Sequence, residues 1–116
     1  MSEWTIYYNP RCGTCRNTLE RLEARGIKPK VVEYLKTPPT AAELESILKK
    51  TGLGPEVITR MKEPVIEEKG LSFEGLSRKE WLAVIAENPI LLQRPIVVRD
   101  GRAVVARPPE AVDVLL

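Results

Sequence analysis

The chain has 116 residues, 43% of them hydrophobic, and its 18 Lys and Arg against 16 Asp and Glu give a formal net charge of +2. A chain of this length can bury a core of its own, so we expect one domain over residues 1–116. Charges of both signs are interspersed without a basic stripe, which argues against nucleic acid as the main partner. No apolar run approaches membrane-spanning length and no signal peptide is recognisable, so we predict a cytoplasmic protein without membrane contact.

The first predicted elements form a strand, a helix and a second strand. Residues 4–8 are aromatic and β-branched and stop at Asn9-Pro10, which is typical of a strand followed by a turn. From Cys15 apolar positions recur at helical spacing, and Gly26 supplies the left-handed position that ends such a helix. A second strand is predicted over 30–34. This order predicts a right-handed βαβ unit with parallel strands.

The next stretch, about residues 38–90, is predicted to be mostly helical. The pattern Ser/Thr-x-x-Glu occurs at 40–43 and at 77–80, and each occurrence is a capping box that predicts the beginning of a helix. Between them, a helix over 55–61 would begin with a proline in its first turn. The helix that begins at 77–80 is expected to end before Pro89.

The C-terminal part predicts a hairpin and a last helix. Asp100-Gly101 separates the β-branched runs 96–99 and 102–106, which is a strong signal for a two-residue hairpin turn. Pro108-Pro109 then suits the beginning of a terminal helix. The apolar side of that helix is expected to carry Val112, Leu115 and Leu116.

The order β-α-β, helices, β-β-α predicts an α/β protein with a thioredoxin-like fold. Its four-stranded mixed sheet would have flanking helices and a helical insertion between the second and third strands. In this architecture the segment entering the third strand carries a cis-proline beside the cysteine loop, and Pro95 is the candidate. The alternative is an ordinary trans proline at the start of a strand.

The chain has only two cysteines, Cys12 and Cys15, which lie between the first strand and the first helix. A Cys-x-x-Cys pair in a reducing compartment is more often catalytic than structural. Two other interpretations stay open, a zinc site and incidental buried cysteines. Zinc usually takes four ligands, and the chain offers no histidine and no third cysteine, so no metal is expected.

Cys12 is the candidate nucleophile. Unpaired N–H groups and the dipole at a helix N-terminus would lower its pKa from about 8.5 into a roughly 3.5 to 7.5 window. Arg11 and Arg16 flank it and could contribute, although both could equally be solvated surface residues. Cys15 would lie one turn into the helix, more buried and less acidic, and is the candidate resolving thiol.

The same helix N-terminus is suited to bind an anion. Arginine offers a planar, permanently charged fork that fits tetrahedral oxyanions. Three arginines stand out by position, and we predict them as oxyanion ligands if the sheet brings them to the cysteine loop: Arg60, Arg94 and Arg107.

Three segments, residues 7–19, 88–98 and 107–110, together resemble the ArsC family of glutaredoxin-linked arsenate reductases. The resemblance spans nearly the whole chain and implies a cytosolic enzyme of arsenical resistance that reduces arsenate to arsenite. It implies Cys12 as the nucleophile and the three arginines as oxyanion ligands. Glutathione is implied as co-substrate and glutaredoxin as partner, with no bound cofactor. Supporting roles would fall to other residues of these motifs: Asn9, Arg11, Gly13, Thr14, Arg16 and Pro95.

The chain departs from that family pattern at two positions. Tyr8 stands where well-known members carry histidine, so the helix end and the arginines would have to acidify Cys12. Cys15 stands where many members carry serine, and it opens an internal route to a disulfide that bypasses glutathione. Two other functions therefore stay open: a general dithiol-disulfide oxidoreductase that uses both cysteines, and a redox regulator of the Spx type that binds RNA polymerase. An oxyanion ligand at Arg107 argues against the regulator.

Overall fold

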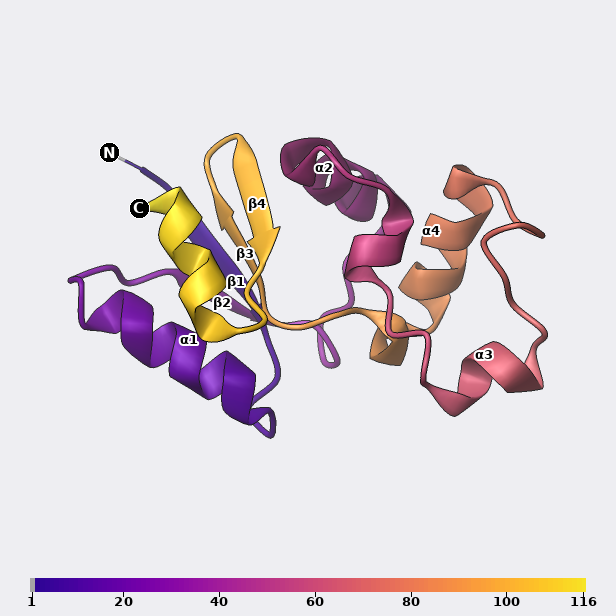
Figure 1. Ribbon diagram of the computed structural model, residues 1–116, viewed down its shortest axis with the longest axis horizontal. Helices are drawn as coiled ribbons and strands as arrows, with labels where there is room; N and C mark the ends of the chain where they lie inside the picture. Colours follow the sequence, from indigo (N-terminus) through magenta and orange to yellow (C-terminus); the bar gives the residue numbers. More distant parts are fainter. Residues whose placement is uncertain (1) are drawn as a thin grey trace.

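The strands of the computed structural model, which describes residues 2–116, form one mixed sheet in the order β2-β1-β3-β4 (Figure 1). The strands are β1 (Trp4–Tyr8), β2 (Lys30–Glu33), β3 (Ile96–Arg99) and β4 (Arg102–Val105). β1 runs parallel to β2 and antiparallel to β3, and β3 is antiparallel to β4. The predicted parallel βαβ unit and four-stranded mixed sheet are therefore confirmed.

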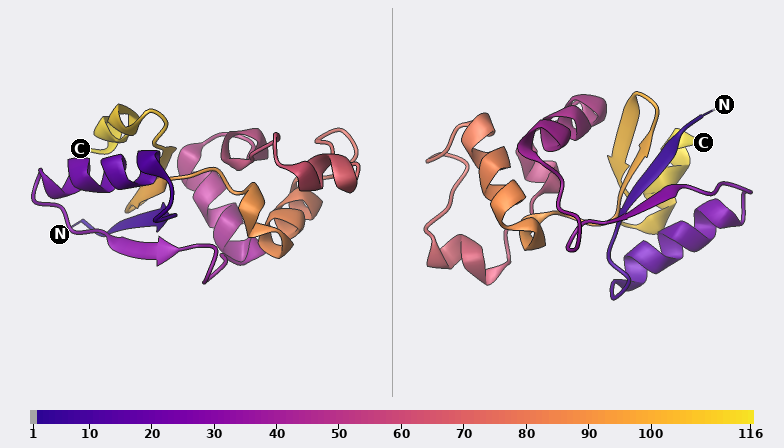
Figure 2. Two further views of the ribbon diagram at one scale, coloured as in Figure 1. Left: turned by 90° about the horizontal axis from the view of Figure 1, so that it is seen from below. Right: turned by 180° about the vertical axis from the view of Figure 1, so that it is seen from behind.

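Helices cover both faces of the sheet, and further helices lie to one side of it (Figures 1 and 2). The C-terminal helix packs against α1 on one face, whereas α2 packs against β4 on the other. Beyond α2, the remaining helices between β2 and β3 extend the molecule to 43 Å along its longest axis. The α-helices are α1 (Gly13–Glu23), α2 (Ala41–Thr51), α3 (Pro64–Glu68) and α4 (Arg78–Glu87), and the 3-10 helices are η1 (Pro55–Ile58), η2 (Pro89–Leu91) and η3 (Pro109–Leu115).

Two hydrophobic cores lie on the opposite faces of the sheet. Strand β3 contributes side chains to both cores, because successive side chains of a strand point to opposite faces of the sheet. Ile96 and Val98 pack into the core under α2 and α4, whereas Val97 packs into the core under α1 and η3. The larger core lies under α2 and α4 and includes Tyr34, Leu44, Leu48, Trp81 and Leu82.

Capping places the two longer helices of the insertion as predicted. Thr40 accepts the backbone N–H of Glu43, and Ser77 accepts that of Glu80, each within a complete capping box. α2 ends at Gly52, whose φ of 72° is the left-handed conformation that glycine adopts without steric cost.

The prediction for residues 55–61 was wrong in extent and in kind. The segment forms only the short 3-10 helix η1, and its C-cap Thr59 has an extended backbone. That extended backbone pairs with Leu92 in an isolated bridge, so tertiary pairing replaces further helical turns. The short helices α3 and η2 were not predicted, although each begins at a proline.

Smaller differences concern element ends. The second and fourth strands each end one residue early, and α1 begins at Gly13 rather than at Cys15. The last helix is a 3-10 helix that buries Val112 and Leu115 as predicted. Leu116 is 42% exposed, so its assignment to the apolar side was wrong, because it follows the last helical residue.

The hairpin is confirmed at the predicted turn. Arg99 pairs with Arg102, which leaves Asp100-Gly101 as the two-residue connection. Asp100 takes a left-handed φ of 51°, as the first position of a tight hairpin turn requires. Among the helices of residues 2–116, none has the length and apolarity needed to cross a bilayer.

Candidate active site

Four chain segments meet at one end of the sheet. Tyr7 pairs with Ile96, which pairs in turn with Val105, so the end of β1, the beginning of β3 and the end of β4 lie side by side. β2 runs parallel to β1 and ends at the same edge. The cysteine loop, the Arg94-Pro95 segment and Arg107 therefore converge, although they are far apart in the sequence.

The Arg94-Pro95 peptide bond is cis, which confirms the predicted cis-proline. A second cis bond, Arg107-Pro108, was not predicted. The Pro95 carbonyl accepts the backbone N–H of Ala106 at 2.9 Å. The two arginine-proline segments are thus held next to each other.

Asn9 organises the cysteine loop. Its backbone carbonyl accepts the N–H of Cys12 at 3.0 Å, and its side-chain Oδ1 accepts the N–H of Arg11 at 3.0 Å. Cys12 is the N-cap residue of α1, with an extended backbone at φ −94° and ψ 120°. The first N–H groups of a helix have no partner within the helix, and the backbone N–H of Cys15 acts to lower the pKa of the Cys12 thiol.

Arg107 links the Cys12 sulfur to the Arg94 segment. Its Nη1 lies 3.8 Å from Cys12 Sγ and donates to the Arg94 carbonyl at 2.9 Å. The Cys12 residue is 9% exposed, so it is largely buried but still reaches the protein surface. Sulfur and guanidinium therefore face the same small volume.

The surroundings of Cys12 favour its thiolate. Burial raises the pKa of the Cys12 thiol, but hydrogen bonds from the Cys15 backbone, the Arg94 and Arg107 guanidinium groups and the Cys15 thiol outweigh it. The resulting pKa is about 7, lowered from the ordinary 9.0. The Cys12 thiolate is therefore accessible near neutral pH.

Cys15 has the opposite character. It is fully buried, and burial together with the negative charge on Cys12 raises its pKa to about 12, although the Asn9 backbone and Arg94 act in the other direction. Both cysteines are free thiols in this structure. Cys15 is thus a neutral hydrogen-bond donor to Cys12, as the predicted order of acidity requires.

Arg94 offers an unused donor. Its Nε is buried and finds no hydrogen-bond partner within residues 2–116. A buried charged donor without a partner is costly, and a tetrahedral oxyanion would satisfy it.

Arg60 lies near this segment, but its guanidinium is occupied. Its backbone N–H donates to the Leu91 carbonyl at 2.7 Å, which places it beside the chain that leads to Arg94. Its Nε lies 3.1 Å from Glu63 Oε1. No hydrogen bond joins Arg60 to Cys12 in the described part of the chain, so its role as an anion ligand stays a prediction.

The remaining predicted residues support the loop through the backbone or lie at the surface. Arg16 Nη1 donates to the Pro10 carbonyl at 3.3 Å, and the Thr14 carbonyl accepts the Thr18 hydroxyl at 2.8 Å. Gly13 begins α1, and a side chain there would meet only Arg16, at an ordinary 3.8 Å. Arg11 is exposed, and within residues 2–116 its side chain forms no hydrogen bond to either sulfur.

Sequence reasoning missed two residues, Tyr34 and Glu63. Tyr34 directly follows β2 and buries its hydroxyl beside the cysteine loop, and Glu63 is the partner of Arg60. The sequence predicted Tyr34 only as the last residue of the second strand, which gave no indication of its neighbours. The spacing of Arg60 and Glu63, three residues apart, was the available signal for their ion pair.

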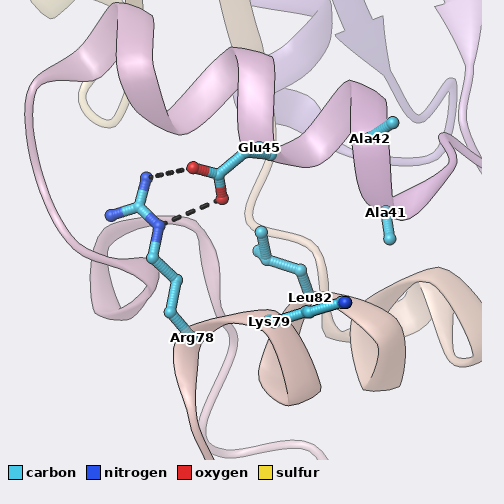
Figure 3. Close-up of a pocket in the computed structure, with 6 residues that line it drawn as sticks. All are labelled: Ala41, Ala42, Glu45, Arg78, Lys79 and Leu82. Carbon is cyan, nitrogen blue, oxygen red and sulfur yellow. Dashed lines mark hydrogen bonds and ion pairs between the residues drawn. The ribbon is translucent and has the colours of Figure 1, made fainter.

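A hollow elsewhere on the molecule lacks such chemistry. It lies between α2 and α4, has a volume of about 520 Å³ and is mostly apolar (Figure 3). Glu45 closes one side by a double hydrogen bond to Arg78, at 3.0 and 3.1 Å. Its lining residues are Ala41, Ala42, Glu45, Arg78, Lys79 and Leu82.

Comparison with known proteins gives one consistent result. The family model described as ArsC family matches residues 7–115. The chain is 43% identical over 117 aligned residues to the arsenate reductase of Neisseria meningitidis serogroup A, with 100% of both chains covered. It is 40% identical to an arsenate reductase of Escherichia coli, over 97% of this chain and 79% of that protein. The solved structure of arsenate reductase from Vibrio cholerae matches with a TM-score of 0.94 at 41% identity, over 98% of each chain.

Proposed function

Because the chain belongs to the ArsC family, we propose that it is an oxidoreductase that reduces arsenate to arsenite, with Cys12 as its nucleophile. The observation that carries the assignment of residues is the contact of Arg107 with both Cys12 Sγ and the Arg94 carbonyl. It places one guanidinium against a thiolate of lowered pKa and against the backbone of Arg94, whose own side chain has an unused buried donor.

In the proposed first step, the Cys12 thiolate attacks the arsenic of a dihydrogen arsenate ion, and one oxygen leaves as water together with the two protons of that ion. An S–As bond forms, and the charge that shifts onto the remaining oxygens is neutralised by Arg94 and Arg107. Arg60 would join them if its guanidinium exchanged Glu63 for the anion.

In the second step, the thiol of glutathione attacks the Cys12 sulfur. The S–As bond breaks, its electron pair stays on arsenic, and arsenite is released. Cys12 and glutathione are then joined in a disulfide, so two thiols supply the two electrons that arsenic gains. We propose that glutaredoxin removes this glutathione, with no bound cofactor, and that the reaction takes place in the cytosol.

The second candidate function is a dithiol route, and the Cys15 thiol beside Cys12 favours it. Cys15 would attack the Cys12 sulfur in place of glutathione and close an internal disulfide, which a dithiol protein would then reduce. The pKa of about 12 makes Cys15 a weak nucleophile until a base removes its proton. The same chemistry would serve a general thiol-disulfide oxidoreductase.

The test is arsenate-dependent oxidation of NADPH, coupled through glutathione, glutaredoxin and glutathione reductase. We expect turnover with the native chain and none with Cys12→Ser. Cys15→Ser is the matched control, because it removes the other sulfur of the same turn. Full turnover in Cys15→Ser would assign the glutathione route, and lost turnover the dithiol route.

Mass spectrometry of the arsenate-treated protein identifies the intermediate directly. Arsenic or glutathione on Cys12 supports the first route, and an internal disulfide supports the second. Absence of arsenate-dependent turnover in the native chain would refute the reductase, and capture of RNA polymerase would then favour the regulator.

A further inference from the structure

Tyr34 lies directly under the cysteine loop. The parallel register pairs Tyr8 of β1 with Glu33 of β2, so the next residues of the two strands, Asn9 and Tyr34, leave the sheet side by side. Tyr34 begins a turn in which Glu33 accepts the N–H groups of Lys36 and Thr37, both at 2.9 Å. The turn fixes the backbone of Tyr34 at the reactive end of the sheet.

The Tyr34 hydroxyl is buried without a partner. The side chain is fully buried in the core under α2 and α4, and its Oη finds no hydrogen bond within residues 2–116. Nearly all buried hydroxyl groups are hydrogen-bonded, and an unpaired one destabilises the fold. Phenylalanine would fill the same space without that cost, so packing alone does not account for the tyrosine.

The groups around the hydroxyl belong to the reactive end. Burial raises the pKa of Tyr34, and the charged and polar groups that also act on it are Arg94, Asn9, Cys15 and Cys12. Arg94 comes from the segment before β3, and the other three from the cysteine loop and α1. The hydroxyl therefore faces the loop from the interior side, whereas arsenate would approach from solvent.

Asn9 connects the hydroxyl with both sulfurs. Its carbonyl accepts the Cys12 N–H, its Oδ1 accepts the Arg11 N–H, and its backbone acts to lower the pKa of the Cys15 thiol. Its side-chain nitrogen, Nδ2, is the donor that remains for the Tyr34 hydroxyl, and the Asn9 side chain acts to lower the pKa of Tyr34. A hydroxyl that engages it would restrain a residue on which the position of both cysteines depends.

We propose that Tyr34 is a positioning residue of the cysteine loop, whose buried hydroxyl engages the Asn9 side chain when Cys12 is ionised and so holds the loop around both sulfurs. The kinetic consequence rests on the proposed reductase function, whereas the effect on the thiol does not. Tyr34 touches neither arsenate nor glutathione, so its effect falls on kcat and on the ionisation of Cys12 rather than on KM.

The test is Tyr34→Phe, which removes only the hydroxyl. We expect the pKa of Cys12, followed by the ultraviolet absorbance of its thiolate, to rise by about half a unit to one unit, the size of one lost hydrogen bond. We expect kcat for arsenate to fall about three- to tenfold, with KM changed less than about twofold, for the same reason. Tyr7→Phe is the matched control, because Tyr7 is a half-buried tyrosine packed against the same core with Glu43 as its charged neighbour.

A double-mutant cycle tests whether the effect passes through Asn9. Asn9→Ser removes the amide, and the shifts from Tyr34→Phe and Asn9→Ser should not add in the double variant. The midpoint of thermal unfolding should be the same or higher in Tyr34→Phe, since a buried unpaired hydroxyl is lost.

An unchanged Cys12 pKa in Tyr34→Phe would overturn the inference, as would an equal shift in Tyr7→Phe or full additivity with Asn9→Ser. These titrations need no arsenate. If the native chain failed to reduce arsenate while Tyr34→Phe still shifted the thiol pKa, the reductase would be refuted and the positioning role would stand.

Discussion

The cysteine end of the sheet and the helical lobe between β2 and β3 (α2 to η2, residues 41–91) are held together by different kinds of contact. At the cysteine end, polar groups from distant segments meet: Asn9, Cys12, Arg94 and Arg107. In the lobe, helices pack through buried aliphatic and aromatic side chains, and the ion pair of Glu45 with Arg78 closes an apolar hollow (Figure 3).

The difference teaches that an apolar hollow does not mark the reactive chemistry in this molecule. The hollow between α2 and α4 holds an exposed ion pair but neither a thiol nor a buried charge. The cysteine end holds two thiols whose pKa values move apart, to about 7 and about 12. Groups of opposite perturbation in one turn are typical of a reactive site.

The first prediction separates the regions by stability. Leu48→Ala removes a fully buried side chain of α2 and should lower the free energy of unfolding by about 2 to 5 kcal/mol. The pKa of Cys12 should stay unchanged, because none of the groups that shift it lies in the lobe. Urea unfolding and thiolate titration measure the two quantities. Leu53→Ala, at a side chain 57% exposed, is the control, and a shifted Cys12 pKa in Leu48→Ala would contradict the separation.

The second prediction concerns the arginine that contacts the sulfur. Arg107→Ala should lower kcat/KM for arsenate about 10²- to 10³-fold, the loss expected when one donor to a developing oxyanion is removed. The pKa of Cys12 should rise as well, because one hydrogen bond to the thiolate is lost. Arg102→Ala removes the same charge from the exposed beginning of β4 and should leave both values unchanged. If both variants changed kcat/KM and the Cys12 pKa equally, Arg107 would act only through the net charge of the protein and not through its contact with the sulfur.

The third prediction is a pH dependence of stability in which the two cysteines act in opposite directions. The folded pKa of Cys12 lies below its ordinary 9.0, so its contribution is present above pH 9 and is lost as the pH falls through about 7. The folded pKa of Cys15 lies above 9.0, so its contribution is present below pH 9 and is lost as the pH rises toward about 12.

The measurement is the free energy of unfolding in urea from pH 6 to pH 11. Cys12→Ser should flatten the rise between about pH 7 and pH 9, and Cys15→Ser should flatten the fall above about pH 9. A native curve without either slope would show that the two thiols ionise alike in the folded and unfolded chain.

Most elements of the fold were predictable because their signals are local. The capping boxes at Thr40 and Ser77, and the turn at Asp100-Gly101, each specify a structure within four residues of sequence. The region around η1 was mispredicted because Thr59 pairs with Leu92, more than thirty residues away. Local pattern carries no information about such a partner.

The features of the site likewise divide into those that local sequence predicted and those that depend on tertiary contacts. The Cys-x-x-Cys spacing at a helix beginning predicted the order of acidity of the two thiols, because both depend on one turn of backbone. The contact of Arg107 with Cys12 depends on the register of three strands, so the sequence could only nominate the residue. The Arg60–Glu63 pair and the buried Tyr34 hydroxyl were found only in three dimensions.

The Arg99 side chain links the N-terminal and C-terminal segments, which bears on their local unfolding. Its guanidinium lies 5.1 Å from the centre of the Trp4 ring, donates to Ser2 Oγ at 3.1 Å and also donates to the Leu115 carbonyl. The Arg99 side chain thus contacts both the beginning of β1 and the end of η3, at the end of the sheet opposite the cysteines. Fraying of either terminal segment deprives the other of a partner, so we expect the amides of both segments to exchange hydrogen as a single cooperative unit.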